Sequence, residues 1–258
     1  MVAPGWARST TVTVVAAVAC AWPYADASAA KRDKNAPRAE VQIGLCADAD
    51  AIERALALRP REAPYETWQF DDAALSLLGH GVRVRLRAKE SESELTIKIA
   101  GQDCNTLPDG LVPRRQGKCE FDVYGASRDG AVSLTRRLDT GATRELLAGR
   151  MTVTQALSPA QIRYLREVLG FYPLPADLRA LGPITNRAYV TKDSGYEVDL
   201  SQLPGGERYA EISKKVPQAA IDPTFRALDV VLRQAGIAAC ADQTSQAAAK
   251  LRLLLQRN

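Results

Sequence analysis

The stretch from Gly81 to Ile99 constrains the fold of this chain more than any other. It reads GVRVRLR, then a polar segment AKESESE, then LTIKI. Both outer runs alternate apolar residues with charged or polar ones, which is the period of a β-strand with two unlike faces. Arg83, Arg85 and Arg87 share one face of the first run. The stretch therefore predicts a β-hairpin that carries a row of cations on one face.

Two interpretations of this cation row are open. The arginines either face bulk water or line a cavity that holds an anion, and the pattern taken alone favours bulk water. A buried row would need carboxylates, trapped water or a ligand beside it, because unpaired buried charge is costly. The chain has 258 residues, 46% of them hydrophobic, which is enough for a sizeable core. Its formal net charge of +4 is too small to argue for nucleic-acid binding.

Residues 1–29 predict an export signal that is removed from the mature protein. Arg8 gives a short basic start, and the apolar run 11–22 has the length of a signal-peptide core but cannot span a bilayer. Two A-x-A cleavage patterns follow, at 25–27 and 27–29. The sequence AVAC ending at Cys20 offers a second interpretation, a weak lipobox with a lipid anchor on that cysteine. Either processing predicts an exported protein, periplasmic or associated with the cell envelope. Membrane contact is expected only through the lipid anchor at Cys20, if that anchor forms.

The other four cysteines suit an oxidising compartment. Cys104 and Cys119 flank a loop with Pro and Gly between two expected strands, so they are natural partners. Cys46 and Cys240 would then join the start of the domain to its end. Four cysteines allow three pairings, and this one is preferred. A zinc site is disfavoured, because the chain has no CxxC pair and His80 is its only histidine.

After a polar linker at 30–39, the residues 40–258 are expected to form one domain. Besides the hairpin, strands are expected at 40–45, 65–70, 118–125, 133–136, 186–191, 196–200 and 208–214. Helices are expected at 48–58, 71–78, 158–169, 222–235 and 242–256. Strands, an inserted helical region, more strands and final helices predict an α+β domain built on an antiparallel sheet or barrel. The motifs GxxxxGK, GxGxxG and GxSxG are absent.

The order of these strands and their motifs resembles the CYTH-like family, also called the triphosphate tunnel metalloenzymes. The resemblance extends from Glu40 to about Lys250. Its segments are YETWQFDD at 65–72, LLGHGVRVR at 77–85, ELTIKIAG at 94–101, YEVDL at 196–200 and YAEISKKV at 209–216. Each match is short, and their order and spacing carry the resemblance. It implies an eight-stranded antiparallel barrel around a charged tunnel, with accessory helices outside it.

The resemblance also implies which side chains form the site. Phosphate would be bound by Arg83, Arg85, Lys98, Arg187 and Lys215, with Lys250 as a weaker candidate. The family uses Mg²⁺ or Mn²⁺ held by carboxylates, which suits hard oxygen ligands. The corresponding candidate metal ligands are Glu40, Glu120, Asp199 and Glu211. Carboxylates in a barrel with a buried cation row have a second interpretation, as its salt-bridge partners.

One departure from the family pattern bears directly on catalysis. The family signature on the first strand is ExExK, and here Glu40 is followed by Gln42 and Gly44 in place of the second acid and the lysine. Glutamine is neutral and a poorer ligand for a dication. Glu211 on the late strand is likewise followed by Ser213 rather than by an acid. No catalytic residue is assigned.

Three functions follow from these observations. The favoured one is an exported domain that binds a phosphorylated or polyanionic small molecule in a basic tunnel, with catalysis weakened or lost. The alternative is a Mg²⁺- or Mn²⁺-dependent triphosphatase acting on tripolyphosphate or nucleoside triphosphates. The third is a structural envelope protein whose barrel is filled by internal ion pairs. No nucleic-acid partner is expected, because the aromatic residues are too few and scattered for a stacking platform.

Overall fold

A computed structural model describes residues 37–90, 92–108, 110–113, 115–243 and 246–256. The predicted signal segment, the lipobox at Cys20 and the linker up to residue 36 lie outside the described residues. The first strand begins at Arg38, two residues before the expected start of the domain. No helix of the described residues is long and apolar enough to cross a membrane.

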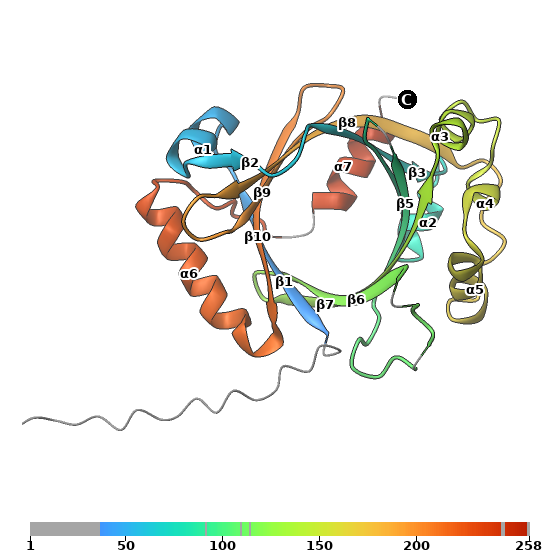
Figure 1. Ribbon diagram of the computed structural model, residues 1–258, viewed down its shortest axis with the longest axis horizontal. Helices are drawn as coiled ribbons and strands as arrows, with labels where there is room; N and C mark the ends of the chain where they lie inside the picture. Colours follow the sequence, from blue (N-terminus) through green and yellow to red (C-terminus); the bar gives the residue numbers. More distant parts are fainter. Residues whose placement is uncertain (1–36, 91, 109, 114, 244–245, 257–258) are drawn as a thin grey trace, which may run out of the picture. The chain divides into compact units, whose positions relative to one another are not determined.

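The described chain is organised around a closed ring of nine strands (Figure 1). In ring order these are β8, β3, β4, β5, β7, β6, β1, β10 and β9, and β9 pairs back onto β8. A tenth strand, β2 (Leu58–Pro60), pairs only with the end of β8. The bounds of the ring strands are β1 (Arg38–Leu45), β3 (Tyr65–Asp71), β4 (Val82–Ala88), β5 (Ser93–Ala100), β6 (Gly117–Tyr124), β7 (Ser127–Leu138), β8 (Arg179–Thr191), β9 (Glu197–Gln202) and β10 (Arg208–Pro217).

The α+β class and the barrel are as predicted, whereas the eight-stranded, fully antiparallel arrangement is wrong in detail. Strands in a ring can alternate in direction at every neighbour only if their number is even. With nine strands one pair must be parallel, and that pair is β1 and β6. The remaining neighbours in the ring are antiparallel.

Two strands are longer than their sequence suggests. The expected strand 133–136 is the end of β7, which begins at Ser127 and runs for 12 residues. Its first three residues are exposed and show no alternation of apolar residues. Strand β8 begins at Arg179, seven residues before the expected strand 186–191, and contains Gly182 and Pro183. A register shift between Thr67 and Gln69 of β3 lies opposite this Gly-Pro pair, and such bulges accommodate residues that strands normally exclude.

Apolar side chains point outward from the ring, and helices cover them. The helices are α1 (Ala49–Ala55), α2 (Ser76–Gly79), α3 (Thr140–Leu147), α4 (Val153–Ala156), α5 (Pro159–Glu167), α6 (Ile221–Gln234) and α7 (Gln246–Leu255), with a 3-10 helix at Gln218–Ala220. One apolar core lies between β4, β5, β7 and the layer of α3, α4 and α5. Another lies between β1, β9, β10 and the helices α1 and α6. The polar faces of the strands are therefore left to the interior of the ring.

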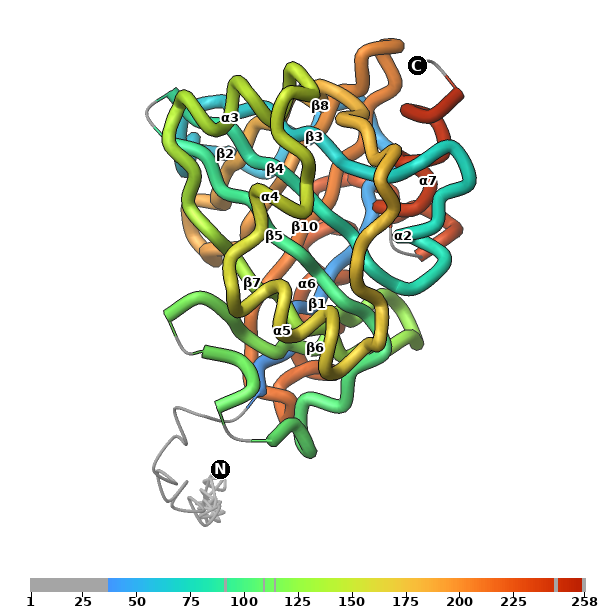
Figure 2. The backbone as a smooth tube through the Cα atoms, turned by 90° about the vertical axis from the view of Figure 1, so that its right-hand side faces the viewer, coloured from blue at the N-terminus to red at the C-terminus, as the bar shows by residue number. Residues whose placement is uncertain are grey.

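Both predicted disulfide pairings are present, Cys46 with Cys240 and Cys104 with Cys119. The first joins the end of β1 to the segment before α7. The Gln243 side chain reinforces that junction, because it accepts a hydrogen bond from the Gly44 amide and donates one to the Gly44 carbonyl. Helix α7 lies within the outline of the ring in Figure 1 and toward one end of the barrel in Figure 2. The disulfide thus holds the chain that carries α7 against the barrel wall.

Candidate functional site

The interior of the ring is a polar cavity of about 500 Å³, lined by all nine ring strands and by α7. Alternation along each strand builds it, because residues two apart point to the same side. On the opening hairpin, Val84, Leu86 and Ile97 are buried in the outer core, and the residues between them line the cavity. The cation row therefore faces the cavity and not the outside of the barrel.

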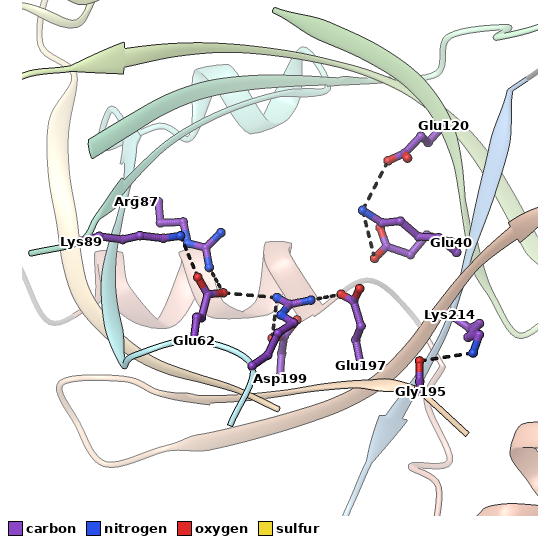
Figure 3. Close-up of polar contacts among 11 residues, drawn as sticks. Glu40, Glu62, Arg87, Lys89, Glu120, Gly195, Glu197, Asp199 and Lys214 are labelled. Carbon is purple, nitrogen blue, oxygen red and sulfur yellow. Dashed lines mark hydrogen bonds and ion pairs between the residues drawn. The ribbon is translucent and has the colours of Figure 1, made fainter. Parts of the chain in front are cut away.

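Strands β4 and β5 present a cationic wall made of Arg83, Arg85, Arg87 and Lys98. Most of these cations have an acidic partner. Arg83 lies 3.9 Å from the Asp122 carboxylate, and Lys98 forms a closer ion pair with the same group. Arg87 pairs with Glu62 (Figure 3). It also stacks on the ring of Tyr65 at 3.8 Å.

Arg85 is the exception on this wall. No described carboxylate lies within the 4.0 Å of an ion pair to its guanidinium. Burial lowers the pKa of Arg85, and the neighbouring charges of Arg83 and Arg87 lower it further. Arginine nevertheless stays protonated in proteins. Its side chain still reaches the open space of the cavity, so the site holds a permanent positive charge without a counter-ion beside it.

The four candidate metal ligands all line the cavity as predicted, on strands β1, β6, β9 and β10. However, cationic side chains of the protein lie between these acids. Glu40 and Glu120 each lie 4.0 Å from the amine of Lys215 (Figure 3). Asp199 lies 3.9 Å from the guanidinium of Arg61. The arrangement of Glu40, Glu120 and Asp199 corresponds to the salt-bridge interpretation of the acids.

Burial perturbs the pKa values of the acids on this side of the cavity. It raises the pKa of Glu211 to about 8, although the charge of Lys250 opposes the rise. Burial also raises the pKa of Glu40, against the opposing charge of Lys215. The pKa of Asp199 is raised by burial as well, with Arg61 acting against the shift. Burial thus favours the protonated form of all three acids.

These residues do not fit a preformed site for Mg²⁺ or Mn²⁺. Among the described residues, no three Asp, Glu, His or Cys side chains lie close enough to hold a metal ion. Gln42, at the position of the missing acid, accepts a hydrogen bond from the Tyr124 hydroxyl. At the position of the missing lysine, a Cβ on Gly44 would lie 3.0 Å from the Gln246 side-chain nitrogen. Both departures from the family signature are thus built into the packing of this chain.

Arg187 does not lie in the cavity, which corrects its predicted role as a phosphate ligand. It points from the outer face of β8 and pairs with Glu53 of α1 at 2.9 Å. Its neighbour Asn186 faces inward instead and donates a hydrogen bond to Thr67. A shift of one residue along a strand moves a side chain to the opposite face of the sheet. The motif match did not determine which residues of this strand face the cavity. The other predicted phosphate ligands, Arg83, Arg85, Lys98 and Lys215, all line the cavity.

Sequence reasoning missed two cations of the cavity. Arg61 comes from the loop after β2 and pairs with Glu197, and no periodicity predicts where a loop residue points. Lys118 is at the start of β6 and pairs with Glu120. The alternation of KCEFDVYG does place Lys118 on the face of Glu120 and Asp122, so that residue could have been found. Lys250, the weaker candidate, enters the cavity from α7.

Solved structures of other proteins share this fold. No family model matches the sequence, and no curated protein matches it. A candidate adenylyl cyclase from Hippeastrum, described as having a dominant triphosphatase activity, has a TM-score of 0.57 and 16% identity over 83% of this chain and 95% of that one. A candidate adenylate cyclase from Bacillus halodurans has a TM-score of 0.53 and 12% identity over 81% of this chain and 95% of that one. The chain therefore has the CYTH-like tunnel fold, as its motifs predict.

Proposed function

We propose that the tunnel binds a phosphorylated or otherwise polyanionic small molecule and that the domain is mainly a binding protein. Arg85 is the observation that carries this proposal. A guanidinium that points into a cavity without a carboxylate partner among the described residues is an electrostatic site for an anion. Its planar fork of donors matches phosphate oxygens bidentately. Arg83 and Lys98, which share only Asp122, lie on the same wall and add to the positive potential.

The acidic half of the cavity supports binding rather than metal-dependent turnover. Glu40, Glu120 and Asp199 face cations of the protein itself, and Gln42 replaces an acid of the family signature. A dication would have to displace these cations and gather ligands that the described residues do not bring together. The volume of about 500 Å³ lies within the range of small-molecule sites.

Calorimetric titration of the oxidised domain with tripolyphosphate tests the proposal. We expect binding in the tunnel, weakened at least about tenfold by Arg85→Gln, because a charge-assisted hydrogen bond contributes roughly 1.5–3 kcal/mol. Arg187→Gln is the matched control, since it removes an arginine from the outer face of the same barrel. Binding that is absent in the wild type, or lost equally in both variants, would refute the proposal and favour the structural envelope protein.

Metal-dependent triphosphate hydrolysis is the second candidate. It is supported by the described activity of the Hippeastrum structure and by the acids on the tunnel wall. Phosphate release from tripolyphosphate, measured with and without Mg²⁺ or Mn²⁺, distinguishes the two. Turnover that requires the metal and is lost in Glu120→Gln would establish the enzyme.

We also propose that the chain is exported, to the periplasm or the cell envelope. The apolar run at 11–22, the A-x-A patterns and the two disulfides support this. Mass spectrometry of the mature N-terminus tests it. A chain that begins at Ala30 indicates cleavage without an anchor, a lipidated Cys20 indicates the anchor, and an intact Met1 contradicts export.

A further inference from the structure

Charged side chains line two opposite walls of the cavity. The cationic wall is on β4 and β5. On the other wall, called the acidic wall, Glu197, Asp199 and Glu211 of β9 and β10 face the cavity. The cations Arg61, Lys215 and Lys250 lie beside these acids. In the ring, β5, β7, β6 and β1 separate β4 from β10 on one side, and β3, β8 and β9 separate them on the other. The two walls therefore face each other across the lumen.

Each wall contains charged groups that have no hydrogen-bonding partner among the described residues. On the acidic wall, the Oδ1 atom of Asp199 is buried and accepts no hydrogen bond among the described residues. Its nearest cation is Arg61 at 3.9 Å. Glu211 forms no ion pair within 4.0 Å in the described part of the chain, although it interacts electrostatically with Lys250. On the cationic wall, the corresponding group is Arg85.

The charges of Arg85 and Asp199 attract each other, although the two side chains are not in contact. Each interacts with the other's charge, yet they form no ion pair. A simple anion would neutralise Arg85 but leave the Oδ1 atom of Asp199 without a hydrogen-bond donor. A dication would need a set of converging carboxylates, which the described residues do not supply. An ammonium group is a compact single charge with three donors. Unlike a dication, it can be bound by the oxygens of one carboxylate.

We propose that the ligand is a zwitterion, a phosphate ester that also carries a primary amine. Its phosphoryl group contacts Arg85, and its ammonium group contacts the Asp199 carboxylate on the opposite wall, near Glu211. This inference rests on the proposed anion-binding function and specifies the ligand class of the same cavity. A molecule with both charges bridges the two walls and gives each unpartnered group a hydrogen-bonding partner.

Phosphoethanolamine and ethyl phosphate, which differ by the amine, are the probes. Calorimetric titrations of the oxidised domain compare their affinities, with tripolyphosphate as a third ligand. We expect phosphoethanolamine to bind at least about tenfold more tightly than ethyl phosphate, a factor that corresponds to 1.4 kcal/mol. Asp199→Asn should abolish this preference and strengthen ethyl phosphate binding, because it removes a repelling charge. The control Asp222→Asn, on the exposed surface of α6, should keep the preference.

The outcomes separate this inference from the function on which it rests. Equal affinity for the two monoesters, or a preference that survives in Asp199→Asn, overturns the zwitterion proposal even if tripolyphosphate binds. No binding of any of the three probes overturns anion binding itself. Circular dichroism of each variant confirms that a lost preference does not reflect a lost fold.

Discussion

Arg85 differs from its neighbours on β4 in having no carboxylate beside it. Arg83 approaches Asp122, and Arg87 is held by Glu62 and by the ring of Tyr65. The charge of Arg85 lies near those of Arg83 and Arg87 with no carboxylate beside it, which destabilises the empty protein. Such groups are retained where binding needs them. The three arginines of one strand therefore serve different purposes, although the sequence presents them as equivalent.

Substitution of two of these arginines should affect stability in opposite directions. Arg85→Gln is expected to raise the urea midpoint of the empty domain, because it removes an unpartnered cation between two others. Arg87→Gln is expected to lower it, because Glu62 loses a partner and Tyr65 loses its stacked guanidinium. Equilibrium unfolding in urea without phosphate measures both. Destabilisation by Arg85→Gln comparable to that of Arg87→Gln would mean that Arg85 is already neutralised within the protein.

Glu211 should make stability depend on pH. Burial raises its pKa from 4.5 to about 8 in the folded state. Between those values the folded state binds a proton that the unfolded state releases, so this group's contribution to the unfolding free energy falls as pH rises. Glu211→Gln removes that dependence, and its stability relative to the wild type should increase from about pH 5 to about pH 9. Parallel urea midpoints of the two proteins across this range would contradict the assignment.

At the scale of elements, helix α5 links the outer layer to the barrel wall. Ser158 caps the helix, and Pro159 is its first residue, as the sequence predicts. Gln161 completes the capping box and also donates hydrogen bonds to the carbonyls of Leu95 and Leu134. These carbonyls belong to β5 and β7, so one buried amide fixes the helix against two strands. The sequence shows the cap but not this second contact.

Gln161→Ala should therefore destabilise the domain more than the loss of a cap alone. Gln155 is the matched control, because it completes the same capping box in α4 while being exposed. We expect Gln161→Ala to cost roughly 1–3 kcal/mol more than Gln155→Ala, since two buried carbonyls lose a donor. Urea unfolding of the two variants gives the difference. Equal costs would show that the contacts of Gln161 with the strands contribute little.

The strands with clear alternation were predictable, and those without it were not. The register of β4 and β5 follows directly from GVRVRLR and LTIKI. The exposed start of β7 and the Gly-Pro pair in β8 carry no such signal, so the strands predicted from the sequence are shorter than the observed ones. The inward face of Asn186 and the outward face of Arg187 depend on the phase of β8, which the bulge beside it obscures. Arg61 comes from a loop, which has no periodicity to interpret.

At the scale of the whole molecule, the barrel has a polar interior and an apolar exterior under helices. The apolar cores that stabilise the domain lie outside the ring. The interior can therefore hold charged side chains without disturbing the packing of those cores. The parallel pairing of β1 with β6 was not predictable from local patterns, since it follows from the number of strands that close the ring. The two disulfides were predictable, because they join ends of elements that the strand order brings together.

Anion binding at Arg85 can be observed in a crystal structure of the oxidised domain soaked with tripolyphosphate. We expect phosphoryl oxygens within hydrogen-bond distance of the Arg85 guanidinium, inside the ring and on the β4 side of the cavity. Tripolyphosphate bound only on the outer surface, for example at Arg187, or a cavity that stays free of the anion at saturating concentration, would contradict it.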